Sequence, residues 1–348
     1  MLGMPNIHAS DCMNHQWDPQ GPVCTHCQEV CPAGAIAMVD GNPRIHDACT
    51  GCTACVSICP TAAIHHERLN IAAIVRQARV SVMQGRQILR AACTFADDAD
   101  ADIQVPCHAA WNPLLLSCLA GEGVHVLETE GIAQCASCPA RFGEQVLAQT
   151  EKDYAAFSKG LEVRLILSRE ITRKAPATKK RQEPEPERRA FFRKLVPTLA
   201  QGAAMTMAQI SEVMRDDGIH AEAQDTPARS ASLRLFTKAL ARLRPNFTPV
   251  PRLPSVPLGT IQADARCNAC GQCVTECPTE ALTLRPFGTQ QVLEFQPDAC
   301  IGCEHCADIC PEHAITSLPS ISLPAIAAGR SRPLVMVAAK PNQQSVIS

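Results

Sequence analysis

Residues 49–60, CTGCTACVSICP, contain the cysteine spacing C-x-x-C-x-x-C-x-x-x-C-P, which recurs along the chain. With two further full copies and one altered copy, 15 of the 21 cysteines in the 348 residues fall into two blocks. The motif cysteines are Cys49, Cys52, Cys55 and Cys59; Cys267, Cys270, Cys273 and Cys277; Cys300, Cys303, Cys306 and Cys310; and, in the altered copy, Cys24, Cys27 and Cys31. Three thiols on one short loop suit a metal centre better than pairwise disulfides.

A secreted disulfide framework is the competing interpretation of so many cysteines. The total is odd, and residues 1–20 contain neither the basic nor the apolar stretch of a signal peptide. We therefore expect a cytoplasmic protein without structural disulfides. No apolar run approaches the ~20 residues that cross a bilayer, and the longest candidates are residues 113–120 and 334–339.

The repeated spacing is the ligand pattern of bacterial-type [4Fe–4S] ferredoxins, in which the fourth cysteine of each motif binds the other cluster. Three thiolates on a tight loop cap one face of a cluster, so the fourth must arrive from a distant segment. The crossed pattern predicts three complete ligand sets: Cys267, Cys270, Cys273 and Cys310; Cys277, Cys300, Cys303 and Cys306; and Cys31, Cys49, Cys52 and Cys55. Zinc is the alternative metal.

A fourth set is incomplete, because Gly21 stands where the first cysteine of the altered motif belongs. Cys24, Cys27 and Cys59 remain for this site, and we expect Cys12 to supply the missing thiolate. The other solutions are a [3Fe–4S] cluster or a labile four-iron cluster with a non-cysteine ligand. The nearby histidines, which are more often surface residues than ligands, are His8, His15 and His26.

Composition agrees with small modules that hold clusters. Aromatic residues make up only 3% of the chain, and modules of about 60 residues bury too little apolar surface to be very stable alone. Cluster binding adds folding free energy to such modules. The formal net charge of −2 gives no sign of nucleic-acid binding. Bound clusters would make the protein more acidic, which suits docking to basic patches on redox partners.

The predicted fold class is α+β, with two ferredoxin-like 2×[4Fe–4S] modules flanking a small α/β parallel-sheet domain. Short strand pairs are expected in the modules at residues 37–39 with 43–45 and at 282–284 with 292–295. The predicted divisions are an N-terminal module at 1–67, a middle domain at 68–170, a linker with a short helical patch at 171–257, a C-terminal module at 258–318 and a tail at 319–348.

The linker is predicted from composition. Residues 173–189 are charged and contain prolines, so we expect disorder there. Residues 188–196 could form a short basic amphipathic helix, and 245–257, with five prolines, is expected to be an extended spacer. The tail carries no signal that predicts a structure.

In the middle domain, strands are expected to alternate with helices, which favours a mainly parallel sheet. The predicted strands are 88–93, 103–106, 124–129 and 161–167, and the predicted helices are 70–84, 111–119 and 139–157. Four cysteines, namely Cys93, Cys107, Cys135 and Cys138, follow strand ends, which meet at one edge of a parallel sheet. They could bind an iron–sulfur cluster, perform thiol–disulfide chemistry, bind structural zinc or remain plain thiols. Cys118 is expected to be a core residue.

About 90 residues of the middle segment resemble the small iron–sulfur delta subunit of methyl-viologen-reducing hydrogenases, which passes electrons to heterodisulfide reductase. The resemblance rests on a cysteine that ends the first strand, Cys107 before a helix, and a cysteine pair after a later strand. That family's pair is more widely spaced than Cys135 and Cys138. The resemblance implies a possible [2Fe–2S] or other cluster here.

The two terminal modules resemble bacterial-type two-[4Fe–4S] ferredoxins over about 110 residues. The resemblance implies one-electron transfer without a substrate of the protein's own. We expect a non-enzymatic polyferredoxin that relays electrons between larger redox enzymes such as a hydrogenase, a formate dehydrogenase or a reductase. The rival interpretations are a disulfide or persulfide enzyme that uses the middle thiols, and a carrier or sensor of iron–sulfur clusters.

Overall fold

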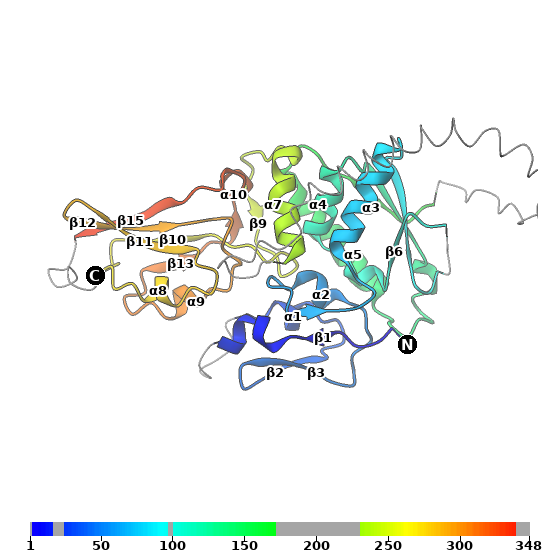
Figure 1. The fold of residues 1–348 in the computed structure, drawn as a ribbon, viewed down its shortest axis with the longest axis horizontal. Coiled ribbons are helices and arrows are strands. Elements are labelled where there is room, and N and C mark those ends of the chain that lie inside the picture. Colours follow the sequence, from blue (N-terminus) through cyan, green and yellow to red (C-terminus); the bar gives the residue numbers. More distant parts are fainter. Residues whose placement is uncertain (1, 17–23, 97–99, 172–229, 339–348) are drawn as a thin grey trace, which may run out of the picture. The chain divides into compact units, whose positions relative to one another are not determined.

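The computed structural model describes residues 2–16, 24–96, 100–171 and 230–338 (Figure 1). These residues form a mixture of helices and strands with a parallel sheet in the middle of the sequence. None of the helices within these ranges is both long and apolar enough to cross a membrane. Most of the predicted linker, including the expected disordered stretch and basic helix, lies outside the described residues.

The N-terminal region is built from two short antiparallel strand pairs and short helices. Strand β1 pairs with β4 and β2 pairs with β3, so the hairpin expected after the altered motif is present. The elements are β1 (Asn6–Ile7), η1 (Ala9–Asp11), η2 (Met13–Gln16), α1 (His26–Glu29), β2 (Ile36–Val39), β3 (Asn42–Ile45), α2 (Ala54–Ile58) and β4 (Ile64–His65).

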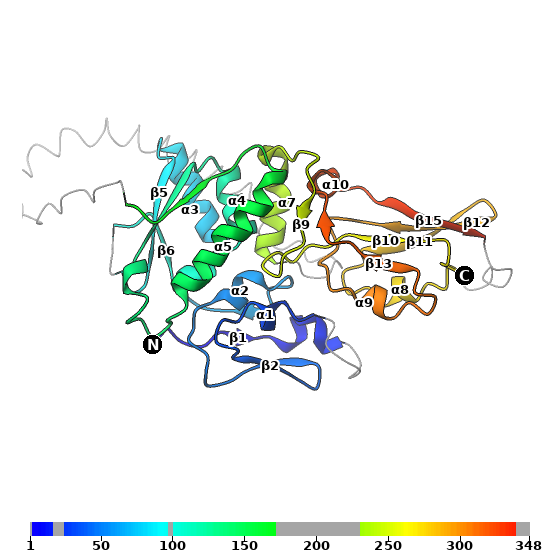
Figure 2. The ribbon, with the colours of Figure 1, turned by 180° about the vertical axis from the view of Figure 1, so that it is seen from behind.

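A four-stranded parallel sheet with the order β6-β5-β7-β8 forms the middle domain. Figure 2 shows its helix α5 along most of its length. The elements are α3 (Ile71–Met83), β5 (Ile88–Cys93), β6 (Ile103–Val105), η3 (His108–Ala110), α4 (Pro113–Gly121), β7 (Val126–Glu130), η4 (Ile132–Gln134), α5 (Gly143–Phe157), η5 (Ser158–Gly160) and β8 (Ile166–Ser168).

Local capping explains where two of these helices begin. The Asn70 side chain accepts a hydrogen bond from the Ala73 amide at 2.9 Å, and Asn112 does the same for Leu115 at 2.9 Å. Each asparagine therefore satisfies one of the unpaired amides at a helix start. Pro113 occupies the first turn of α4, where its missing N–H costs nothing. The largest differences from the predicted bounds are at α5, which begins four residues later than expected, and at β8, which begins at Ile166 and not at residue 161.

Helix α7 (Ala231–Leu243) lies in the range 171–257, which the sequence predicts to be a linker with a short helical patch. Its apolar side, formed by Leu233, Phe236, Leu240 and Leu243, is buried in the same core as α4. The Phe236 ring lies 5.7 Å from that of Phe157 on α5. The helix is therefore a structural part of the middle domain.

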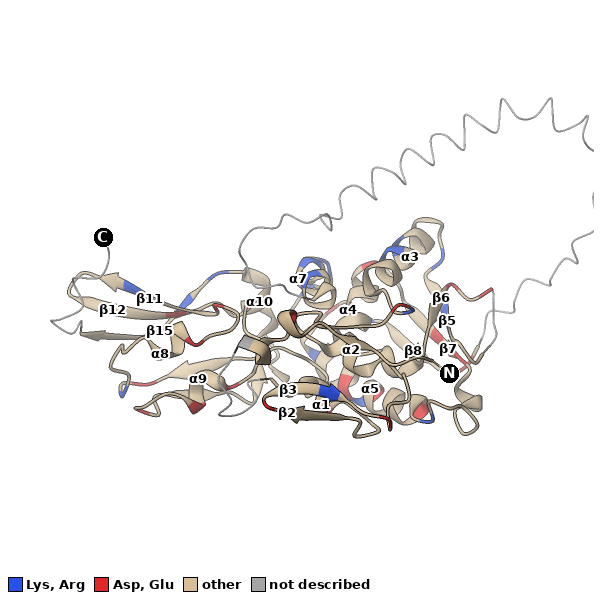
Figure 3. Cartoon of the chain, turned by 60° about the horizontal axis from the view of Figure 1, so that its bottom comes forward, with Lys and Arg blue, Asp and Glu red and all other residues tan. Residues whose placement is uncertain are grey.

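An ion-paired cluster fixes this helix to its neighbours. The Glu122 carboxylate, only 4% exposed, accepts hydrogen bonds from Arg79 on α3 at 2.9 and 3.1 Å and from Arg242 on α7 at 2.7 Å. The basic positions of α3 and α7 are blue in Figure 3. Because Glu122 lies at the end of α4, it joins three helices.

The predicted spacer at 245–257 is packed and only partly extended. Val250 is fully buried, and the Asn246 amide donates to the Gly160 carbonyl at 2.9 Å. Strand β9 (Val250–Pro251) pairs with β14 (Ser320–Ile321), and the Val256 amide then donates to the Leu253 carbonyl at 3.0 Å in a turn. The many prolines gave no information about what covers this segment.

The C-terminal region contains the strand pair expected at 282–284 with 292–295, formed by β11 and β12, and a further strand that the sequence did not predict. Strand β15 adds to β12, so part of the predicted tail belongs to a three-stranded sheet. The remaining elements are β10 (Ile261–Ala263), α8 (Gln272–Thr275), β11 (Leu282–Phe287), β12 (Gln290–Phe295), α9 (His305–Asp308), β13 (Ile315–Ser317), α10 (Leu323–Ala328) and β15 (Arg332–Ala338).

Candidate iron–sulfur sites

The three full motifs share an unusual backbone conformation around the second cysteine. The residue on each side of that cysteine has a positive φ, whether or not it is glycine. Such a conformation costs a non-glycine residue on the order of 1–3 kcal/mol, so its recurrence indicates a constrained site. The residues concerned are Gly51 and Thr53, Ala269 and Gly271, and Gly302 and Glu304. In the altered motif, the corresponding Thr25 has φ −120°.

Backbone amides also point at cysteine sulfurs after the last cysteine of three motifs. The third residue after that cysteine has a positive φ, and the next amide donates to the sulfur. A hydrogen bond of this kind stabilises a thiolate and tunes a bound cluster. The pairs are Ala35 with Cys31 at 3.2 Å, Ala281 with Cys277 at 3.2 Å and Ala314 with Cys310 at 3.3 Å.

The eight C-terminal motif cysteines gather into two cavities in the crossed pattern. One cavity is lined by Cys277, Cys300, Cys303 and Cys306. We call this set the C-proximal site. A second cavity is lined by Cys267, Cys270, Cys273 and Cys310, which form the C-distal site. Each set takes one cysteine from the other motif, which fits a cluster with ligands on four corners.

The seven N-terminal motif cysteines divide between two sites, which the altered motif leaves unequal. Cys31, Cys49, Cys52 and Cys55 line a cavity and form the N-inner site. The second group, the N-outer site, is formed by Cys24, Cys27 and Cys59 together with Cys12. The Cys12 and Cys59 thiols lie near enough to Cys24 and Cys27 to raise the pKa of both, although burial is the larger cause.

A polar clasp holds the Cys12 segment beside the first motif loop. The Asn14 side chain, 3% exposed, accepts a hydrogen bond from the Cys24 amide at 2.8 Å and donates one to the Cys24 carbonyl at 2.8 Å. These two bonds place Cys12 where the missing thiolate is needed. Ligation by Cys12 stays a prediction, because proximity alone does not demonstrate a bond to iron.

Two of the three nearby histidines, His8 and His26, make contacts with other residues. The His26 Nε2 atom lies 3.0 Å from the Ile301 carbonyl oxygen. His8 lies 3.5 Å from Asp11, and its ring centroid is 4.1 Å from that of His65. His15 is exposed. These contacts favour Cys12 over His8 and His26 as the fourth ligand.

The four cysteines predicted at strand ends of the parallel sheet do converge. Cys93 ends β5, Cys107 follows β6, and Cys135 and Cys138 follow β7. Burial raises the pKa of Cys107 to about 12, with contributions from Cys135 and Cys93. The Cys135 pKa is also raised, first by burial and then in part by Cys93 and Cys138. We call this group the middle site.

Gly143, at the start of α5, leaves room for two of these sulfurs. A Cβ atom at this position would lie 3.1 Å from the Sγ atoms of both Cys107 and Cys135. Gly131 serves Cys93 in the same way, since a Cβ there would lie 2.7 Å from its Sγ atom. The absence of side chains at these two glycines therefore shapes the middle site.

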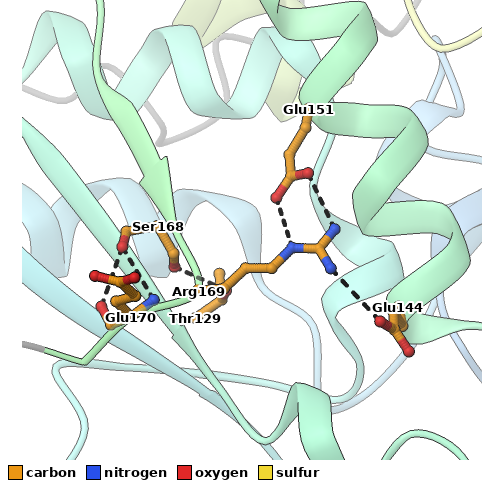
Figure 4. Close-up of polar contacts among 6 residues, drawn as sticks. All are labelled: Thr129, Glu144, Glu151, Ser168, Arg169 and Glu170. Carbon is orange, nitrogen blue, oxygen red and sulfur yellow. Dashed lines mark hydrogen bonds and ion pairs between the residues drawn. The ribbon is translucent and has the colours of Figure 1, made fainter.

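A charged network lies beside the middle site (Figure 4). Arg169, just after β8, donates to both Glu151 oxygens at 2.9 and 3.0 Å and lies 3.5 Å from Glu144. The Thr129 hydroxyl donates to the Ser168 carbonyl at 3.0 Å. Electrostatic interactions link Cys135 with both Arg169 and Glu144. The network ties the end of β8 to α5 and places charge near the thiol.

Among the described residues, no group of three or more His, Cys, Asp or Glu side chains is placed to hold a single metal ion. The remaining cysteine, Cys118, is 1% exposed within the core around α4 and belongs to none of these sites.

Family comparisons agree with the motifs at both ends of the chain. Residues 266–314 match the family model described as a 4Fe-4S dicluster domain, and residues 43–65 match the model described as a 4Fe-4S binding domain. The protein therefore contains two ferredoxin-type [4Fe–4S] domains and is an iron–sulfur, metal-binding protein. Searches of curated proteins and of solved structures gave no match.

Sequence reasoning missed two residues that shape the sites, Asn14 and Gly143, and it missed the contact that His26 makes with the C-terminal module. The local signal for Gly143 is limited to its position five residues after Cys138, at the start of α5. The contact of His26 with Ile301, 275 residues away, has no local signal.

Proposed function

We propose that this protein is a polyferredoxin, an iron–sulfur protein that relays single electrons between redox enzymes. The observation that supports this most strongly is the division of sixteen cysteines into four groups of four, with the crossed connections of a two-cluster ferredoxin. Four [4Fe–4S] clusters, when bound, would supply one-electron transfer.

The protein's own residues would bind the clusters and bury their cysteine ligands. Burial raises the pKa of Cys300 to about 12 and that of Cys303 to about 11, so the metal-free thiols stay protonated at neutral pH. Metal binding releases those protons and stabilises the module. The amides that donate to Cys31, Cys277 and Cys310 would remain in place and stabilise the thiolates.

We propose an additional cluster, of [2Fe–2S] or another type, at the middle site. Cys93, Cys107 and Cys135 are 7%, 5% and 7% exposed, and Cys138 is half-buried. A thiol that exchanges with a protein disulfide needs access and a stabilised thiolate. These three thiols have little access, which favours a cluster over a redox dithiol, and the resemblance to the delta subunit of methyl-viologen-reducing hydrogenases points the same way.

The partners follow from this role. We propose that larger redox enzymes, such as a hydrogenase, a formate dehydrogenase or a reductase, donate and accept the electrons in the cytoplasm. The chain itself would catalyse no reaction on a small substrate. Acidic holo-modules would dock on basic surfaces of those enzymes.

Electron counting tests the proposal. Anaerobically purified full-length protein is titrated with dithionite and reoxidised with a one-electron acceptor while the visible absorbance is recorded. We expect reversible uptake of about one electron for each [4Fe–4S] site. Protein that takes up electrons only in pairs, with a Cys135→Ser variant losing that uptake, would instead support a thiol–disulfide enzyme.

A further inference from the structure

A hydrogen bond joins the ligand loops of the two ferredoxin-type modules. His26 lies between Cys24 and Cys27 in the N-outer site, and Ile301 lies between Cys300 and Cys303 in the C-proximal site. The His26 Nε2 atom is 3.0 Å from the Ile301 carbonyl oxygen. A carbonyl only accepts, so Nε2 carries the hydrogen and donates it.

The surroundings of this bond are buried and tied to the C-terminal loop. His26 is 7% exposed, and within the described part of the chain its Nδ1 atom has no hydrogen-bond partner. Arg252 interacts electrostatically with His26. Its guanidinium also donates to the Gly302 carbonyl and pairs with Glu304. The C-terminal loop is therefore fixed by Arg252 at the point where His26 contacts it.

A second close approach joins the N-inner site to the middle site. Cys52 and Cys107 belong to one buried apolar cluster with Leu2, Ala54 and Ala109. The Cys52 thiol contributes electrostatically to the raised pKa of Cys107, after the larger effect of burial. Both cysteines are buried, with Cys52 9% and Cys107 5% exposed.

Backbone and side-chain hydrogen bonds fix this second junction. The Asn112 side chain, at the start of α4, donates to the Ser57 carbonyl of α2 at 3.0 Å. The Ser232 hydroxyl of α7 donates to the same carbonyl at 3.3 Å, and the Ser230 amide donates to the Pro60 carbonyl at 2.6 Å. The N-terminal module is thus attached to the middle domain through α2.

Within each module the two sites are also neighbours. Helices α1 and α2, which carry Cys27 of the N-outer site and Cys55 of the N-inner site, pack against each other. Helices α8 and α9, which carry Cys273 of the C-distal site and Cys306 of the C-proximal site, do the same. Four successive contacts therefore connect five groups of cysteines.

We propose that these groups form one unbranched series in the order C-distal, C-proximal, N-outer, N-inner and middle site, with His26 and the Cys52–Cys107 contact as the two junctions. This proposal rests on the proposed function, because it requires clusters at the sites. Each transfer would move one electron, so one site is oxidised as its neighbour is reduced, and no proton or covalent bond changes. External one-electron redox proteins would serve the two ends.

The order has a mechanical consequence for the chain. Tunnelling between redox centres falls steeply with distance, so a series works only if every junction stays closed. The polar contact at His26 and the apolar contact at Cys107 therefore act as positioning elements. The N-terminal module occupies the centre of the electron path although it lies at one end of the sequence.

Magnetic coupling between reduced sites tests the order in the full-length protein. Iron and sulfide are first counted, and electron paramagnetic resonance spectra are then recorded after full reduction. Two matched double substitutions each remove the ligands of one C-terminal site. Cys300→Ser with Cys303→Ser removes the C-proximal site, and Cys267→Ser with Cys270→Ser removes the C-distal site. We expect only the first pair to abolish the splitting that the C-terminal module imposes on the N-outer signal.

The same comparison applies at the other junction. Cys49→Ser with Cys52→Ser, which removes the N-inner site, should abolish the splitting of the middle-site signal. Cys24→Ser with Cys27→Ser, which removes the N-outer site, should leave that splitting unchanged. If the wild-type protein holds all its clusters, and loss of the adjacent site and loss of the more distant site change the splitting equally, the proposed order is wrong while the proposed function stands. Protein without clusters at these sites overturns both.

His26 variants test the first junction without removing a ligand. His26→Ala should weaken the splitting between modules, and His26→Gln, whose amide can donate to the Ile301 carbonyl, should retain it. His46→Ala is the matched control, since it removes a similar bond to the Gly34 carbonyl, 3.1 Å away within one module. Equal spectra for His26→Ala and His46→Ala at full iron content would contradict a role of His26 at the junction.

Discussion

The substitution Asn14→Ala tests the Cys12 site without touching a thiol. Two hydrogen bonds of 2.8 Å join the Asn14 side chain to the Cys24 backbone. Each such bond contributes about 0.5–1.5 kcal/mol, so their loss should weaken docking of the Cys12 segment by about 1–3 kcal/mol. That free energy lowers the ratio of docked to undocked segment by roughly 5- to 150-fold.

The assay is the rate at which iron leaves the holo-protein for a chelator, combined with electron paramagnetic resonance after mild oxidation. In Asn14→Ala, iron should leave one site faster, and a three-iron signal should increase, while the other sites keep their iron. Asn246→Ala is the control, because it also removes two side-chain hydrogen bonds, one to the Lys159 carbonyl at 3.0 Å and one from the Thr248 amide at 2.9 Å, far along the chain from the N-outer site. Identical iron release from the two variants would refute the reasoning.

Three further substitutions test other parts of the structure. Phe236→Ala should lower the free energy of unfolding by about 3–5 kcal/mol. Phe247→Ala, at a residue 92% exposed, should change it by less than about 0.5 kcal/mol. Denaturation followed by circular dichroism compares the two variants, and equal effects would show that α7 does not stabilise the middle domain. Gly143→Ala should stabilise helix α5 by about 1 kcal/mol. It should nevertheless lower the iron content of the middle site, because the new methyl group crowds the sulfurs of Cys107 and Cys135. Unchanged iron content would argue against iron ligation by these two cysteines. Glu122→Gln should destabilise the middle domain, but by less than the cost of breaking a fully buried ion pair, which is about 3–5 kcal/mol. The reason is that its two arginine partners are 23% and 47% exposed. Thermal melting at low and high salt measures the effect, and a stability equal to that of the wild type would show that the network contributes nothing.

The cysteine groups could be predicted because their determinants are local. Spacing along a short loop decides which three thiols can cap a cluster, and the crossed fourth ligand follows from the repeat. The parallel sheet was also predictable, because strands such as Ile88–Cys93 are apolar and are separated by helical patterns. The expected position of Cys107 after a strand placed it at the correct edge of that sheet.

Long-range packing could not be predicted in the same way. The apolar spacing of Leu233, Phe236, Leu240 and Leu243 indicates an amphipathic helix, but a helical stripe does not identify the surface that covers it. Strand β15 was missed for a related reason, since an edge strand is defined by its neighbour. The approach of Cys52 to Cys107 depends on α2, α4 and α7 together, so no single stretch of sequence contains it.

Iron speciation in the intact chain tests the central claim most directly. The full-length protein is purified anaerobically from cells grown on ⁵⁷Fe, its iron and acid-labile sulfide are counted, and its Mössbauer spectrum is recorded. We predict about four irons at each of the four ferredoxin-type sites, with matching sulfide and [4Fe–4S] parameters, and further iron at the middle site. Zinc in place of iron, or iron without sulfide, would contradict an electron relay built on these cysteines.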